Sequence, residues 1–106
     1  MFNKRELSLL KDGYFTVIRE NEQFVEVMSK NTKHCWMIFK KRSDRGRPIR
    51  LYHKHTYKTQ WYHLHWETYT VASAVKSIKG HDDYVMKNGE TIRWMRGKGA
   101  AKYGAI

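Results

Sequence analysis

Cysteine and proline are almost absent from this sequence of 106 residues, which contains one of each. The single cysteine, Cys35, has no partner within the chain, so an intramolecular disulfide and a thiolate-based zinc site are both excluded. A chain without disulfides is typical of a reducing compartment, and we therefore expect a cytoplasmic protein. No tract is biased enough in composition to mark the body of the chain as disordered.

Long apolar runs and acidic side chains are also scarce. No stretch approaches the roughly 20 apolar residues of a membrane span, and residues 1–13 lack the apolar core of a signal peptide, so we expect no membrane association. Aspartate and glutamate number 10 against 21 lysines and arginines, which gives a formal net charge of +11. Such an excess favours a polyanionic partner, most commonly nucleic acid. The alternatives are an anionic membrane surface and a protein that is merely basic.

The pattern of apolar, capping and turn residues predicts an α+β fold. Asn3 and Glu6 have the spacing of a capping box, which predicts a short N-terminal helix that ends before Gly13. Runs of β-branched and aromatic residues then predict an antiparallel meander of four to five strands, at residues 14–19, 24–29, 34–40 and within 49–69. Thr68 or Thr70 can cap a C-terminal helix packed on one face of the sheet.

The end of that helix and the domain boundary are less defined by the sequence. Gly80 either ends the helix, in which case Asp82 caps a second one, or lies within it at a cost of roughly 1 kcal/mol. We expect Asp82 and Asp83 to cap a helix or to balance neighbouring lysines. A single domain is predicted over residues 1–90, followed by a basic C-terminal tail over residues 91–106.

The stretch 49–69 holds four of the six histidines, as two His-x-His pairs. We expect it to double back at Thr59 as a hairpin, with the histidines opposed in two pairs: His55 with His63, and His53 with His65. Side chains alternate along a strand, so the four imidazoles would share one face. The turn lacks the glycine or asparagine of tight hairpins, and a slip by one residue would reverse the faces.

Ile49 and Leu51 fall on the histidine face, which leaves either face open as the buried one. We expect the histidine face to be open to solvent, because four buried imidazoles would all need hydrogen-bond partners. Tyr52, Leu64 and Trp66 would then cover the helices from the opposite face. Tyr57 and Trp61 share the histidine face and can stack on unpaired bases.

Three chemistries remain open for the histidines. They can contact phosphate together with Arg50 and Lys54, since imidazole becomes cationic near pH 6.5. They can bind a metal with Glu67 beside them. Two of them can also act as base and acid in metal-independent RNA cleavage. The catalytic candidates are His34, His53, His55, His63 and His65, and the last four are the metal candidates.

Basic residues outside the histidine pairs are the expected contacts to a phosphate backbone, with little readout of sequence. They lie in the loop after the third strand, in the hairpin and in the tail: Lys41, Arg42, Arg45, Arg47, Arg50, Lys54, Arg93, Arg96 and Lys98.

The leading hypothesis is therefore a small nucleic-acid-binding protein for RNA or single-stranded DNA, without catalytic activity, cofactor or bound metal. One alternative is a small histidine-based ribonuclease or a histidine-cluster metal protein. Another is a protein-binding inhibitor of a host nucleoprotein enzyme, because phages and mobile elements carry many small basic proteins. Nothing in the sequence indicates an oligomeric state.

Overall fold

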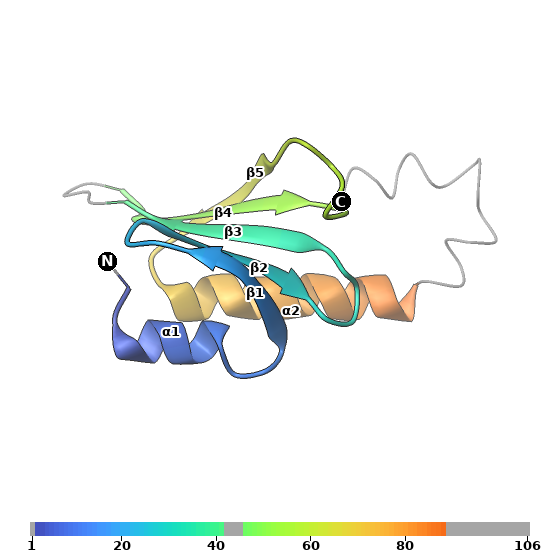
Figure 1. The fold of residues 1–106 in the computed structure, drawn as a ribbon, viewed down its shortest axis with the longest axis horizontal. Coiled ribbons are helices and arrows are strands. Elements are labelled where there is room, and N and C mark those ends of the chain that lie inside the picture. Colours follow the sequence, from blue (N-terminus) through green and yellow to red (C-terminus); the bar gives the residue numbers. More distant parts are fainter. Residues whose placement is uncertain (1, 42–45, 89–106) are drawn as a thin grey trace.

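The computed structural model describes residues 2–41 and 46–88, which form a five-stranded sheet and two helices (Figure 1). The five strands are antiparallel and lie in sequence order from β1 to β5. In chain order the elements are α1 (Lys4–Leu10), β1 (Phe15–Glu20), β2 (Phe24–Ser29), β3 (Cys35–Lys40), β4 (Ile49–Lys54), β5 (His63–Thr68) and α2 (Val71–Lys87). This architecture confirms the predicted α+β class and the predicted order of elements.

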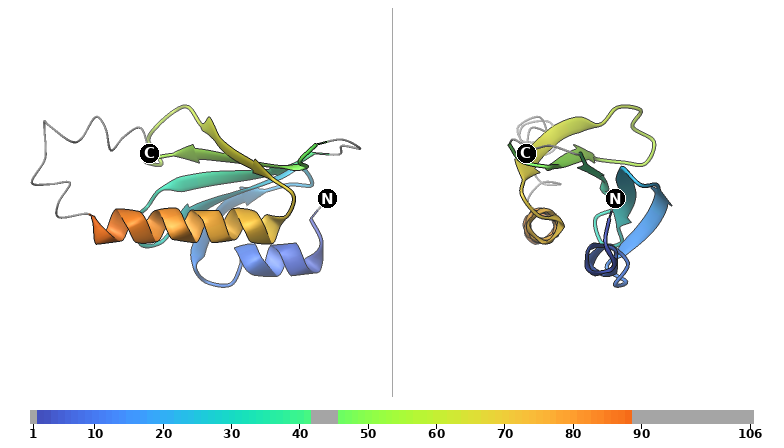
Figure 2. Two further views of the ribbon diagram at one scale, coloured as in Figure 1. Left: turned by 180° about the vertical axis from the view of Figure 1, so that it is seen from behind. Right: turned by 90° about the vertical axis from the view of Figure 1, so that its left-hand side faces the viewer.

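Both helices lie on the same face of the sheet, which curves over them (Figure 2). The hydrophobic core fills the space between these two layers. It comprises Phe2, Leu10, Phe15, Val25, Val27, Trp36, Ile38, Ile49, Leu51, Val71, Ala74, Val75 and Ile78. Within the described residues, no helix is both long enough and apolar enough to cross a membrane.

The helix starts were predictable because their signals are local. The amide of Glu6 donates to Asn3 Oδ1 and the amide of Asn3 donates to Glu6 Oε1, each over 2.8 Å, which completes the predicted capping box. Thr70 caps α2, since its Oγ1 accepts from the amide of Ser73. Gly13 follows α1 with a φ of +102°, in the region that favours glycine.

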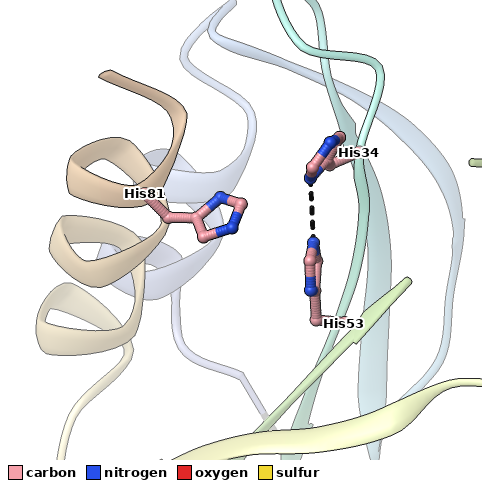
Figure 3. A group of neighbouring side chains, drawn as sticks. All are labelled: His34, His53 and His81. Carbon is pink, nitrogen blue, oxygen red and sulfur yellow. Dashed lines mark hydrogen bonds between the residues drawn. The ribbon is translucent and has the colours of Figure 1, made fainter. Parts of the chain in front are cut away.

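Helix α2 continues through Gly80 to Lys87 as a single element. The alternative in which Asp82 caps a separate helix is therefore wrong. Asp82 instead lies on the inner side of α2, where its side chain is fully buried. The preceding residue, His81, also points from α2 towards the sheet (Figure 3).

The predicted register of the histidine hairpin is also wrong. His53 pairs with His63 rather than with His65, and residues 55–62 form a broad connection instead of a turn at Thr59. The register shifts between Leu51 and Tyr52, so β5 carries one additional residue at His65. Without a glycine or asparagine to fix a tight turn, the longer connection and the bulge decide the register.

The histidine face of β4 is turned towards the helices, not towards solvent. His53 alternates with Ile49 and Leu51 on the buried side, and its side chain is 0% exposed. Tyr52 therefore lies on the opposite face, and Leu64 and Trp66 remain 50% and 40% exposed. The expected assignment of faces is therefore wrong. Burying Ile49 and Leu51 removes their apolar surface from water, and a neutral imidazole can be buried on the same face at a lower cost than a charged one.

Candidate functional site

All six histidines of the chain gather into one cluster of rings on the inner face of the sheet. His53 is at its centre. The ring centroids of the other five lie 4.9–5.7 Å from that of His53: His34, His55, His63, His65 and His81. The cluster thus unites the residue before β3, the β4–β5 hairpin and α2.

Trp36 on β3 supports the cluster from the sheet. Its ring stacks on His53, with centroids 4.1 Å apart and planes inclined by 25°. The edges of His65 and His81 meet the same indole in T-shaped contacts. The indole nitrogen donates to Ser29 Oγ over 3.1 Å, so the orientation of the tryptophan is fixed by a buried hydrogen bond. Ring positions around His53 are therefore determined by a rigid residue.

Three of the six histidines have a geometry that can hold a metal ion (Figure 3). Nδ1 of His34 and Nε2 of His53 lie 2.9 Å apart, and the ring of His81 points towards them from α2. One ring nitrogen from each of the three residues lies within 4.8 Å of the others. Nδ1 of His53 and Nδ1 of His81 are buried without a hydrogen-bond partner. The predicted metal set was different, because it contained neither His34 nor His81.

Four rings of the cluster have a lowered pKa and are neutral at neutral pH: His34, His53, His55 and His65. Burial, followed by the charge of neighbouring histidines, lowers the pKa of His53 from 6.5 to about 2 and that of His34 to about 4. Burial also lowers the pKa of His55 and of His65. A neutral imidazole has a lone pair that can coordinate a metal ion, but it has no positive charge to attract a phosphate. Fully buried His53 cannot reach a phosphodiester, either as an anion contact or as a general acid or base.

The buried carboxylate of Asp82 lies next to His81 on α2. Asp82 accepts hydrogen bonds from Tyr14 Oη over 2.7 Å and from Thr32 Oγ1 over 2.9 Å, and its Oδ1 lies 3.9 Å from Nδ1 of His81. Burial acts to raise the pKa of Asp82, but these polar partners outweigh it, and the pKa is lowered overall. The carboxylate therefore stays ionised and fixes this turn of α2 against β1 and the β2–β3 turn. For Asp82, the expectation that it caps a helix or balances a neighbouring lysine is wrong, because its partners are Tyr14 and Thr32.

His81 is the residue that sequence analysis missed. It stands three residues after Ile78 and seven after Ala74, which places it on the apolar stripe of α2. A polar residue on such a stripe signals a buried partner, and that signal was available in the sequence.

The outer part of the hairpin exposes a second candidate surface. Five large apolar side chains within residues 57–69 are 40–76% exposed, and we call them the aromatic hairpin: Tyr57, Trp61, Leu64, Trp66 and Tyr69. The guanidinium of Arg47 lies 5.7 Å from the ring centroid of Tyr69. A hollow of about 250 Å³, lined by Lys54, His55, Thr59, Trp61 and His63, lies between this surface and the histidine cluster.

The basic residues predicted to contact phosphate differ in exposure and in their partners. Arg47 is exposed, Lys41 is half-buried, and Arg50 pairs with Glu67 over 3.2 Å. Lys54 is only 8% exposed and donates to the carbonyls of Tyr57 and Thr59, so it stabilises the connection 55–62 instead of meeting solvent. The remaining predicted contacts lie outside the described residues: Arg42, Arg45, Arg93, Arg96 and Lys98.

Comparison with protein-family models, with curated proteins and with solved structures finds no match to this chain.

Proposed function

We propose that this protein binds single-stranded nucleic acid, RNA or DNA, by stacking bases on the aromatic hairpin. The observation that carries the proposal is the exposure of Tyr57, Trp61, Trp66 and Tyr69 within 13 consecutive residues of a chain with a net charge of +11. Exposed aromatic rings lose unfavourable hydration when they stack on bases, and each base contributes about 1–3 kcal/mol. Stacking needs no particular base, so binding should tolerate many sequences.

Cations close to the aromatic hairpin support the same proposal. Arg47 and Lys58 are exposed: the guanidinium of Arg47 lies 5.7 Å from the ring centroid of Tyr69, and Lys58 follows Tyr57 in the chain. Such residues neutralise backbone phosphates and release counterions, so affinity should fall steeply as salt is added. The ordered connection 55–62, held by the ammonium of Lys54, limits the entropy that would be lost when a strand binds.

Replacing Trp61 by alanine should weaken binding of a labelled single-stranded oligonucleotide by about five- to a hundredfold, the equivalent of one lost stacking contact. Trp61 is 76% exposed, so the substitution should leave the fold intact. Fluorescence anisotropy at low salt, with RNA and DNA in parallel, measures the change.

The matched control is Trp61→Phe, which retains an aromatic face and should keep most of the affinity. Unchanged binding by Trp61→Ala would contradict the role of the aromatic hairpin. Absence of binding by the wild-type protein at low salt would contradict the proposed function itself.

A further inference from the structure

We propose that His34, His53 and His81 bind one divalent ion of a late first-row transition metal, such as zinc, at the junction of β3, β4 and α2. The three residues are far apart in the sequence, yet one ring nitrogen from each lies within 4.8 Å of the others. In Figure 3 the ring of His81 points from the helix at the gap between His34 and His53. None of the three proposed ligands belongs to the aromatic hairpin.

The spacing of the nitrogens is close to that of a metal site. Zinc–nitrogen bonds of about 2.0–2.1 Å in a tetrahedron place the nitrogens about 3.3 Å apart. The contact of 2.9 Å between His34 and His53 must therefore open slightly, and the widest separation, 4.8 Å, must close. Side-chain rotations would have to bring the most distant nitrogen about 1.5 Å closer, the difference between 4.8 Å and about 3.3 Å.

The cluster also has lone pairs that its own donors do not satisfy. Each neutral imidazole carries one N–H and one lone pair. The bond between His34 and His53 uses one lone pair, while Nδ1 of His53 and Nδ1 of His81 remain buried without a partner. Buried polar atoms without partners are uncommon and cost about 1–3 kcal/mol each. These two Nδ1 atoms are not the ligands: a metal ion on Nε2 of His53 and of His81 would place each ring's proton on Nδ1, and at His81 that proton would face Asp82.

Asp82 is placed to supply the outer carboxylate that histidine ligands of metals usually have, once its 3.9 Å separation from Nδ1 of His81 shortens to a hydrogen bond. With Nδ1 of His81 on the side of Asp82, at 3.9 Å, Nε2 is the nitrogen left for the metal. A metal on Nε2 places the proton on Nδ1, facing an ionised carboxylate that Tyr14 and Thr32 hold in place. Carboxylates in this position orient the ring and increase its basicity. The buried negative charge also compensates part of the charge of the ion.

We expect the fourth ligand position beside His55, whose own ring is not part of the three-nitrogen group. The ring of His55 stacks on that of His34 with centroids 5.1 Å apart, and it borders the hollow beside Trp61. Either His55 closes a four-histidine structural site or a water molecule enters from the hollow. Imidazole ligands select zinc, copper, nickel and their neighbours over magnesium and calcium, which prefer oxygen.

Metal binding by untagged, chelator-stripped full-length protein tests the proposal. Titration with Zn²⁺ against a chromophoric chelator should give one ion per chain, and Co²⁺ should give the visible absorption bands of a tetrahedral complex. His81→Gln should weaken binding by about a hundredfold or more, because a ligand is lost, whereas loss of an outer partner typically costs 10- to 100-fold. His34→Gln should do the same if the wild-type site is the one described.

The matched control is His63→Gln, an exposed member of the cluster outside the three ligands, which should still bind one ion. His55→Gln separates the two forms of the fourth position, since it weakens binding strongly only if His55 is a ligand. Circular dichroism checks that each variant is folded. No stoichiometric binding by the wild type, or equal losses in His63→Gln and His81→Gln, would overturn the proposal. Nucleic-acid affinity measured on the metal-free protein keeps this outcome separate from that of the proposed function.

Discussion

Trp36→Ala is expected to lower the free energy of unfolding by about 3–5 kcal/mol, the range for removing a buried aromatic side chain. Trp36 is the largest fully buried side chain of the described residues, stacks on His53 and donates a hydrogen bond to Ser29. The substitution leaves a cavity at the centre of the inner face and removes the indole N–H that donates to Ser29 Oγ. Urea denaturation followed by far-ultraviolet circular dichroism measures the loss.

Trp61→Ala is the control for this experiment, because it removes the same side chain from a position that is 76% exposed. It should change stability by no more than about 0.5 kcal/mol. If Trp36→Ala does not fold at all, Trp36→Phe provides a milder variant that should still lose more than Trp61→Ala. Equal costs at the two tryptophans would contradict the described packing.

Acidification is expected to destabilise the metal-free protein well above the pH at which its carboxylates titrate. His53 has a pKa of about 2 when folded and 6.5 as its ordinary value, so below pH 6.5 the unfolded chain binds a proton that the folded chain does not. Stability due to this group is therefore complete above 6.5 and falls as the pH is lowered. His34, His55 and His65 act in the same direction, by smaller amounts because they are less buried.

The expected loss between about pH 6.5 and about pH 5 is at least about 1.5 kcal/mol, which is the contribution of His53 alone. Denaturation series at several pH values, with a chelator present, measure it. The buried carboxylates of Glu26 and Asp82 have lowered pKa values and contribute chiefly below this range. A stability that is constant across the range would show that the histidines are solvated.

Local signals in the sequence were sufficient for the elements of the fold. The cap at Asn3, the cap at Thr70 and the positive φ of Gly13 depend on neighbouring residues, so they could be predicted without knowledge of tertiary structure. The meander followed from strands separated by short polar turns. The exact register of β4 and β5 could not be predicted, because the connection 55–62 and the bulge at His65 have no strong sequence signal.

Residue spacing alone could not predict whether the histidine face is buried, because this depends on the cost of burying imidazoles against the gain from burying the apolar residues on the same face. His53 shares its face with Ile49 and Leu51, so the same alternation that gathers the imidazoles also directs them to the core. Sequence analysis placed Ile49 and Leu51 on the histidine face, but gave more weight to the cost of burying imidazoles than to the apolar area buried with them. The contribution of His81 could be recognised only from the apolar stripe of α2, since nothing near it in the sequence resembles a ligand pair.

The two proposed sites meet in the β4–β5 hairpin. Its inner side carries His53, while its outer part carries Trp61 and the other exposed rings. Lys54 links them, because its ammonium donates to the carbonyls of Tyr57 and Thr59 and shapes the connection. A single hairpin therefore presents aromatic rings to solvent and a neutral imidazole to the interior.

The protonation of the His53 ring is the most direct test of the buried histidine cluster. Nuclear magnetic resonance spectra of the imidazole groups of the metal-free protein, recorded as the pH is lowered from about 7 to about 5, report the charge of each ring. His53, assigned by its absence in His53→Gln, should remain neutral throughout, because burial lowers its pKa from 6.5 to about 2. A His53 ring that takes up its proton near 6.5 would contradict the account, because it would place that side chain in contact with solvent.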